Sequence, residues 1–243
     1  MTSSVCAIVG AGDGLGQSLA AQFAAAGMNI ALLSRSAAGS AAALAAATRA
    51  ATTGHAHFFA ADAAAPATIE RACAQATAAL GPIDCLIYNV RGDYDRRAPL
   101  AMTYAELEDI YRLEVIGAFA AAKAVMPAMI ERGHGTVIFS SATAALRGSA
   151  TNPLYAIGKF GLRALAQSLA KAYARDGVHV AHVRLDCTLD VPMVRQYLGA
   201  DFAAADTANT DDVAASYWWI HQQPRSAWSN EVELRPYTEN WTY

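Results

Sequence analysis

The pair Tyr155 and Lys159, in the segment Tyr-Ala-Ile-Gly-Lys, carries the clearest chemical signal in the sequence. Side chains four residues apart share one face of a helix, so the Lys159 ammonium can lie close to the Tyr155 phenol. A free tyrosine has a pKa of about 10, and a nearby cation lowers that pKa because it favours the phenolate. Such a tyrosine can donate a proton to a carbonyl oxygen, or accept one from an alcohol, while a cofactor moves a hydride.

A glycine-rich segment near the start of the chain predicts a nucleotide site. Gly10, Gly12, Gly14 and Gly16 follow an apolar run and precede a segment with helical spacing. Glycines let the backbone approach a pyrophosphate, and the free N–H groups at a helix N-terminus attract its negative charge. A glycine-rich turn without a ligand is the alternative, and the strand–turn–helix context argues against it.

The residues after the second apolar run bear on the choice between NAD and NADP. An acidic residue is expected there when the ribose 2′-hydroxyl is bound, and this chain has Ser34 and Arg35 instead. A guanidinium and a hydroxyl suit a 2′-phosphate, so the pair favours NADP(H) over NAD(H). Asp13, inside the glycine segment, adds negative charge near the same ribose and argues against that preference. Arg35 could also be a solvated loop cation.

These residues must be positioned by alternating strands and helices. Apolar runs of β type alternate with Ala-rich segments of helical spacing along the chain, which predicts βαβ units. The predicted strands are Val5–Val9, Asn29–Ser34, His55–Ala60, Asp84–Asn89, Thr136–Ser141, Val178–Leu185 and Glu231–Arg235. The predicted helices lie near residues 16–26, 38–52, 66–80, 103–132, 153–175 and 213–223. The fold class is therefore α/β: one doubly wound, Rossmann-type domain over residues 1–243, with a mostly parallel seven-stranded sheet and helices on both faces.

Composition excludes several classes of protein. The chain has 243 residues, 58 of them alanine, and a net charge of −3. Near-neutral charge argues against a nucleic-acid surface, and the apolar runs are too short to predict a membrane span of about 18 residues or more. The first residues carry no basic segment typical of a signal peptide, which favours a cytoplasmic protein.

The cysteines and histidines do not predict a metal site. Cys6, Cys73, Cys85 and Cys187 are scattered and are interpreted as free thiols in a reducing compartment. His179 and His182 lie three apart in a predicted strand and so point to opposite faces. His55 and His57 can share a face, but no third ligand accompanies them.

With these motifs in place, nearly the whole chain resembles the short-chain dehydrogenase/reductase family. The glycine segment, the Tyr155–Lys159 pair and the strand ending at Asn89 carry the resemblance. It implies that Tyr155 and Lys159 are catalytic, and that Lys159 also binds the nicotinamide ribose. Further cofactor contacts are implied for the residues Asp13, Leu15, Asp62, Ala63, Asn89 and Val90.

The chain departs from the family pattern at two catalytic positions. The family serine, 13 residues before the tyrosine, aligns with Ala142, and the family asparagine aligns with Glu114. Ser141 and Thr143 flank Ala142 and could supply a hydroxyl if the loop is rebuilt, although neighbours on a regular strand face opposite sides. Glu114 could hold a water in a proton relay, or have no catalytic role.

Other family motifs are altered as well. Tyr88, Val90 and Arg91 replace three residues of the motif that contains Asn89. The family's proline–glycine after the sixth strand reads Asp186-Cys187, and a threonine that contacts the carboxamide aligns with Val191.

The resemblance places the substrate wall near the tyrosine, after the sixth strand and in the C-terminal segment, residues 200–243. Residues there predict a mainly apolar pocket: Leu146, Arg147, Pro153, Leu154, Pro192, Met193, Tyr197 and Leu198.

Four tryptophans, Trp218, Trp219, Trp228 and Trp241, lie in the last 26 residues. Large aromatics are enriched at interfaces, so a homodimer or homotetramer with this tail beside its partner is expected. The rings could instead cover their own sheet.

The resulting hypothesis is an NADP(H)-dependent oxidoreductase. It transfers a hydride between nicotinamide and a small, hydrophobic ketone or alcohol, with Tyr155 as proton donor or acceptor. Loss of a hydroxyl donor lowers rates of this kind by about 10²–10³, so a weak or silent NADP-binding relative is the alternative. A regulatory module that senses NADP(H) through the same fold is the third reading.

Overall fold

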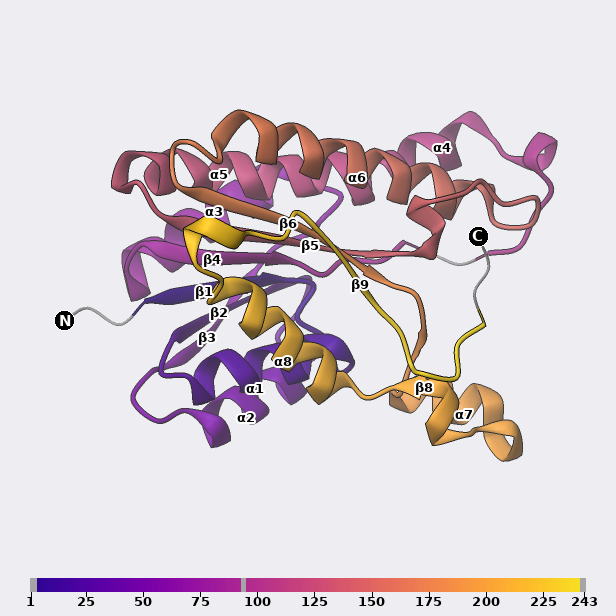
Figure 1. Cartoon of the computed structure of the whole chain (residues 1–243), viewed down its shortest axis with the longest axis horizontal. Coiled ribbons are helices and arrows are strands. Elements are labelled where there is room, and N and C mark those ends of the chain that lie inside the picture. Colours follow the sequence, from indigo (N-terminus) through magenta and orange to yellow (C-terminus); the bar gives the residue numbers. More distant parts are fainter. Residues whose placement is uncertain (1–3, 93–94, 241–243) are drawn as a thin grey trace.

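The computed structural model describes residues 4–92 and 95–240 and contains a seven-stranded parallel sheet with helices on both faces (Figure 1). The strand order is β3-β2-β1-β4-β5-β6-β9. The strands are β1 Val5–Val9, β2 Asn29–Ser34, β3 Ala56–Ala60, β4 Ile83–Tyr88, β5 Gly135–Ala142, β6 Val178–Leu185 and β9 Glu231–Leu234. The prediction of a doubly wound, Rossmann-type sheet is confirmed.

The helices cover the sheet in two layers. The helices α1, α2 and α8 pack on one face, and α3, α5 and α6 pack on the other (Figure 1). Their bounds are α1 Leu15–Ala25, α2 Ala41–Ala50, α3 Pro66–Leu80, α4 Tyr104–Tyr111, α5 Gly117–Arg132, α6 Pro153–Tyr173, α7 Pro192–Leu198 and α8 Thr210–His221.

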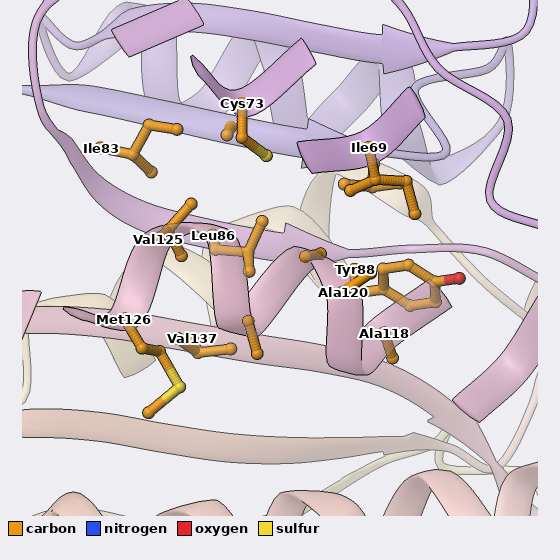
Figure 2. Close-up of a cluster of buried hydrophobic side chains, with 14 of the residues drawn as sticks. Ile69, Cys73, Ile83, Leu86, Tyr88, Ala118, Ala120, Val125, Met126 and Val137 are labelled. Atoms are coloured by element: carbon orange, nitrogen blue, oxygen red, sulfur yellow. The ribbon is translucent and has the colours of Figure 1, made fainter. Parts of the chain in front are cut away.

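Alanines allow the helices to approach the sheet and one another closely. On α5, the residues Ala118, Ala120, Ala121 and Ala122 are all buried in one hydrophobic cluster with strand side chains such as Leu86 and Val137. Figure 2 shows Ala118 and Ala120 in this cluster. Every residue of β1 is buried, as expected of a central strand covered on both faces. The Ala-rich segments are therefore packed helices of the two hydrophobic layers.

The predicted helix 103–132 differs from the observed one in its middle. Thr103 caps α4 by accepting a hydrogen bond from the Glu106 backbone N–H, and the capping box predicts this start. Residues Arg112–Ile116 then form a π-helical turn that joins α4 to α5. Such a turn inserts one extra residue and rotates the following helix, and π turns are frequent at functional sites.

The segment between β6 and β9 contains elements that periodicity does not predict. A short parallel pair, β7 (Thr188–Leu189) with β8 (Thr207–Ala208), brackets α7 beyond the end of β6 (Figure 1). Asn209 caps α8 by accepting backbone hydrogen bonds, so that helix begins three residues earlier than predicted. The predicted last strand is confirmed as β9, parallel to β6.

Within the described ranges, one helix is long and apolar enough to cross a membrane by length and composition. It runs from Tyr104 to Arg132, and 56% of its apolar window is buried inside the protein. This is the central helix of the α3–α5–α6 layer, and its apolar character is explained by that packing.

Candidate functional site

The glycine segment forms a tight turn between β1 and α1. Gly10 has a φ of +86°, and a Cβ there would lie 2.5 Å from the Asn89 carbonyl oxygen, so only glycine fits. A Cβ on Gly16 would lie 2.9 Å from the Cα of Ala11. Gly12, by contrast, has no heavy atom within 4 Å of its Cβ position. The turn is therefore close-packed at Gly10 and Gly16 and open at Gly12. This open side fits a pyrophosphate at the start of α1.

The residues predicted to bind the adenosine half lie at the ends of the neighbouring strands β2 and β3. The Ser34 hydroxyl lies 2.6 Å from that of Ser40 and donates to the Ser36 carbonyl at 3.0 Å. Arg35 is exposed and makes no hydrogen bond or ion pair with another residue in the described ranges. The Asp62 carboxylate accepts a hydrogen bond from the backbone N–H two residues on. Ala63 lies with its carbonyl oxygen against Gly117.

Beyond the glycine turn, a cavity of about 620 Å³ opens at the carboxyl ends of β4, β5 and β6. Ligands of open α/β sheets bind at this edge. Five of the residues predicted to bind the cofactor line it: Leu15, Asn89, Val90, Tyr155 and Lys159. Because the strand order is β3-β2-β1-β4-β5-β6, the predicted residues lie in a row along the edge formed by the carboxyl ends of these strands. Their arrangement along this edge fits a dinucleotide.

Tyr155 and Lys159 both lie on α6 and line this cavity. The Lys159 ammonium lies 5.6 Å from the centre of the Tyr155 ring, as the spacing of four predicts. Lys159 is only 2% exposed and donates hydrogen bonds to the carbonyl oxygens of Val90 and Ser140, at 3.2 and 3.3 Å. The ammonium is thus held between the ends of β4 and β5.

Glu114, the predicted relay residue, contacts Lys159 directly. Its Oε2 accepts a hydrogen bond from the Lys159 ammonium at 2.8 Å, and its Oε1 accepts one from the Gly92 backbone N–H at 2.7 Å. The carboxylate is completely buried. Burial, followed by the negative charge of Glu114, raises the pKa of the Tyr88 phenol well above its ordinary value. Tyr88 donates to the Leu113 carbonyl and lies inside the core.

Both predicted substitutes for the family serine, Ser141 and Thr143, line the cavity, but their hydroxyls differ in what they contact. Ala142 occupies the serine position and lines the cavity. The Ser141 hydroxyl oxygen is buried and has no hydrogen-bond partner among the described residues. The Thr143 hydroxyl donates to the Asp186 carboxylate, so its one proton is already used.

The altered segment after β6 forms a charged cluster that the motif comparison did not anticipate. Asp186 is buried and pairs with Arg235, which also pairs with Glu233 at 2.5 Å. The next residue, Cys187, lines the cavity, and burial raises the pKa of its thiol to about 12. A neutral thiol therefore lies where the family has glycine. The only sequence signal for this thiol was that Cys187 replaces the family glycine.

The substrate-wall prediction is largely not supported. Of the eight residues predicted for that wall, only Arg147 lines the cavity. The opposite side is formed by small and polar residues, including Gly148, Ser149 and Asn152. The segment after the sixth strand does contribute apolar lining residues, but they are Leu189, Val191 and Val194 and not the ones predicted.

The histidines and cysteines do not form a metal centre in the described residues, where no group of three or more metal-ligating side chains occurs. His179 and His182 are both buried in β6, and burial lowers the pKa of each imidazole. The four cysteines are free, with Cys187 less deeply buried than the others.

Comparison with known proteins agrees with this geometry. Residues 4–199 match the model of the short chain dehydrogenase family. Over 179 residues the chain is 28% identical to levodione reductase from Leifsonia aquatica, covering 74% of this chain and 67% of that protein. The crystal structure of a short-chain dehydrogenase from Rhodopseudomonas palustris is 29% identical, with a TM-score of 0.80 and coverage of 96% and 99%.

A third likeness concerns the fold alone. L-sorbose reductase from Gluconobacter frateurii, solved in complex with NADPH and L-sorbose, is 18% identical to this chain. Its TM-score is 0.84, and the match covers 97% of this chain and 96% of that one.

Proposed function

Because the chain belongs to the short-chain dehydrogenase family, we propose that it is an NADP(H)-dependent oxidoreductase acting on a small ketone or alcohol. The observation that carries this proposal is the placement of Tyr155 and Lys159 on one face of α6, in a cavity beside the glycine turn. The bound nicotinamide would supply or accept the hydride. Tyr155 would donate the proton to the carbonyl oxygen, or accept it from the alcohol.

The preference for NADP(H) rests on the end of β2. Arg35 and Ser34 stand where an acidic residue would bind a ribose 2′-hydroxyl, and the Arg35 guanidinium is exposed. A guanidinium offers a rigid fork of donors that matches phosphate oxygens. Asp13, exposed in the glycine turn, opposes this preference. The net expectation is that NADPH binds more tightly than NADH.

The substrate is expected to be small and to tolerate polar surroundings. The charged side chains lining the described part of the cavity are Arg91, Arg147 and Lys159, and the remaining lining is mixed. We expect the substrate to lie between the segment after β5 and the region of β7 and α7, which both line the cavity.

A second candidate function is a non-catalytic NADP(H)-binding protein. The observation that favours it is Ala142, since the serine position carries no hydroxyl, the Thr143 hydroxyl is bound to Asp186, and the Ser141 hydroxyl oxygen is buried. Oxyanion donors of this kind contribute about 10²–10³ in rate, so a slow enzyme and a silent relative are both consistent with the geometry.

The experiment combines cofactor binding with turnover. NADPH and NADH are titrated against the protein by tryptophan and nucleotide fluorescence, and a panel of ketones and diketones is then assayed with the preferred nucleotide. We expect NADPH to bind at least about tenfold more tightly, which corresponds to about 1.4 kcal/mol. We also expect at least one carbonyl to be reduced.

The matched variant is Tyr155→Phe, which removes one oxygen and the transferable proton. Carbonyl reduction should then disappear while the Kd for NADPH stays unchanged. Reduction by Tyr155→Phe at the wild-type rate would contradict the catalytic assignment. Tight NADPH binding without turnover of any carbonyl would favour the non-catalytic candidate, and binding of neither nucleotide would overturn both.

A further inference from the structure

The ion pair between Glu114 and Lys159 lies behind the proposed catalytic tyrosine and is sealed from solvent. Glu114 is 0% exposed and Lys159 is 2% exposed, and their charged atoms are 2.8 Å apart. Among the described residues, the ammonium donates to three acceptors: the Glu114 carboxylate and the carbonyl oxygens of Val90 and Ser140. The hydrogen-bonding capacity of the ammonium is therefore used by the protein itself.

The fold is built around this carboxylate. The π turn Arg112–Ile116 carries Glu114 inward, between the loop after β4 and helix α6. Gly92 donates to its second oxygen, and a Cβ on Gly158 would lie 2.9 Å from the Glu114 Cγ. A Cβ on Gly92 would collide with Ile110, 2.2 Å away. Gly158 thus leaves room for the Glu114 side chain, and Gly92 leaves room for Ile110 beside it.

A carboxylate at this distance changes what Lys159 does to Tyr155. An isolated ammonium next to a phenol favours the phenolate. Here a full negative charge lies 2.8 Å from the ammonium, and burial keeps solvent from screening either charge. The field at the Tyr155 oxygen is then that of an ion pair, which falls off faster than the field of a single cation.

Other charged and titratable groups lie around the same cavity. Arg91 and Arg147 line the same cavity, but both are exposed and therefore screened by solvent. Cys187, on the far side, is a neutral thiol because burial raises its pKa to about 12. Asp186 is paired with Arg235 and accepts a hydrogen bond from the Thr143 hydroxyl.

We propose that Glu114 is a positioning residue that, through Lys159, keeps Tyr155 in its protonated phenol form at neutral pH. This inference rests on the proposed function. In the reductive direction the carbonyl carbon accepts a hydride and its oxygen accepts the phenol proton, giving an alcohol, and solvent then reprotonates the phenolate. In the oxidative direction a phenolate must accept the proton. The site is therefore prepared for carbonyl reduction at neutral pH, and alcohol oxidation requires alkaline pH.

The test measures the titration of Tyr155 itself, in the cofactor-free protein. The tyrosines are labelled with ¹³C at Cζ, their signals are followed by NMR as a function of pH, and the Tyr155 signal is assigned by its loss in Tyr155→Phe. Glu114→Gln retains the shape but removes the charge. We expect the Tyr155 midpoint to fall by about one to three pH units in this variant.

An unchanged midpoint in Glu114→Gln would overturn the proposal. The matched control is Glu231→Gln, which removes a carboxylate paired with Arg163 elsewhere on α6, at 2.7 Å, and should leave the Tyr155 midpoint in place. Removing one partner of a buried pair is destabilising, so circular dichroism verifies the fold. If Glu114→Gln does not fold, the double variant Glu114→Gln/Lys159→Met removes both charges. It is compared with the wild type: because the two charges cancel at Tyr155, the midpoint should stay close to the wild-type value, and a clear rise in the double variant would overturn the proposal.

Failure of this inference and failure of the proposed function give different results. The NMR titration needs neither cofactor nor turnover, so it reports on Glu114 even if the chain is not an enzyme. Carbonyl reduction that depends on Tyr155, together with a midpoint insensitive to Glu114, would refute only the inference. A shifted midpoint without any turnover would refute only the proposed oxidoreductase activity.

Discussion

At the scale of single residues, the missing hydroxyl beside Tyr155 is the most consequential departure from the family pattern. Ala142 lines the cavity where a hydroxyl would orient a carbonyl oxygen, and Thr143 is bound to Asp186. A donor aimed at the developing oxyanion is worth about 10²–10³ in rate. The proposed turnover is therefore expected to be slow.

We therefore expect Ala142→Ser to raise kcat for carbonyl reduction by about 10- to 100-fold, because it restores a donor to the developing oxyanion. The measurement is steady-state kinetics with NADPH and the carbonyl that the wild-type protein reduces. Ala144→Ser, which adds a hydroxyl at another lining position, serves as the control and should leave kcat nearly unchanged. Equal effects of the two substitutions would show that the hydroxyl at position 142 has no special role.

At the scale of secondary-structure elements, strand β6 buries a histidine that should make stability depend on pH. His182 is 1% exposed, and its Nε2 has no hydrogen-bond partner among the described residues. Burial lowers its imidazole pKa to about 4, so the folded protein holds this side chain neutral. In the unfolded chain the same group titrates near pH 6.5.

Between about pH 6.5 and pH 4 the unfolded chain therefore binds a proton at His182 that the folded protein does not. The free energy of unfolding should fall as the pH falls through this window, by up to about 3 kcal/mol. Urea denaturation at pH 7 and pH 4.5 measures the loss, which should be smaller in His182→Leu. His57→Leu, at an exposed position of β3, should retain the wild-type dependence. If His182→Leu loses as much free energy of unfolding as the wild type and His57→Leu, the prediction is wrong.

At the scale of the whole molecule, the tail aromatics mostly pack within their own chain. The Trp218 ring contacts Phe23 edge-on at 5.3 Å, and the Trp228 ring stacks on His179 at 4.8 Å. Trp219 is 55% exposed, and Trp241 lies outside the described residues. Phe119 on α5 and Phe160 on α6 are also exposed, at 48% and 41%. Two apolar surfaces are thus available for association.

We expect a homodimer or homotetramer, since large exposed apolar groups favour burial in an interface. Light scattering at micromolar concentration measures the assembly, and a monomer would contradict the expectation. Phe119→Asp and Trp219→Asp distinguish the α5–α6 face from the C-terminal segment 200–243. Phe119→Asp should shift the protein to smaller species. A shift with Trp219→Asp alone would place the interface in the tail.

Local sequence determined much of this protein. Alternation of apolar runs with helical spacing fixed the order of strands and helices, because burial on both faces of a parallel sheet requires that pattern. The glycine turn and the spacing of Tyr155 and Lys159 were also local signals, since one turn or one helix places these residues. The resemblance to the family followed from these motifs.

Only the tertiary structure decided which partner each site residue has. The contact of Glu114 with Lys159 joins residues 45 positions apart through a π turn, and periodicity does not reveal a one-residue insertion in a helix. The engagement of Thr143 by Asp186 and the composition of the cavity wall depend on loops whose conformation is set by long-range contacts. Electrostatic effects arise from such contacts, so the charge around Tyr155 was determined by the packing of distant elements.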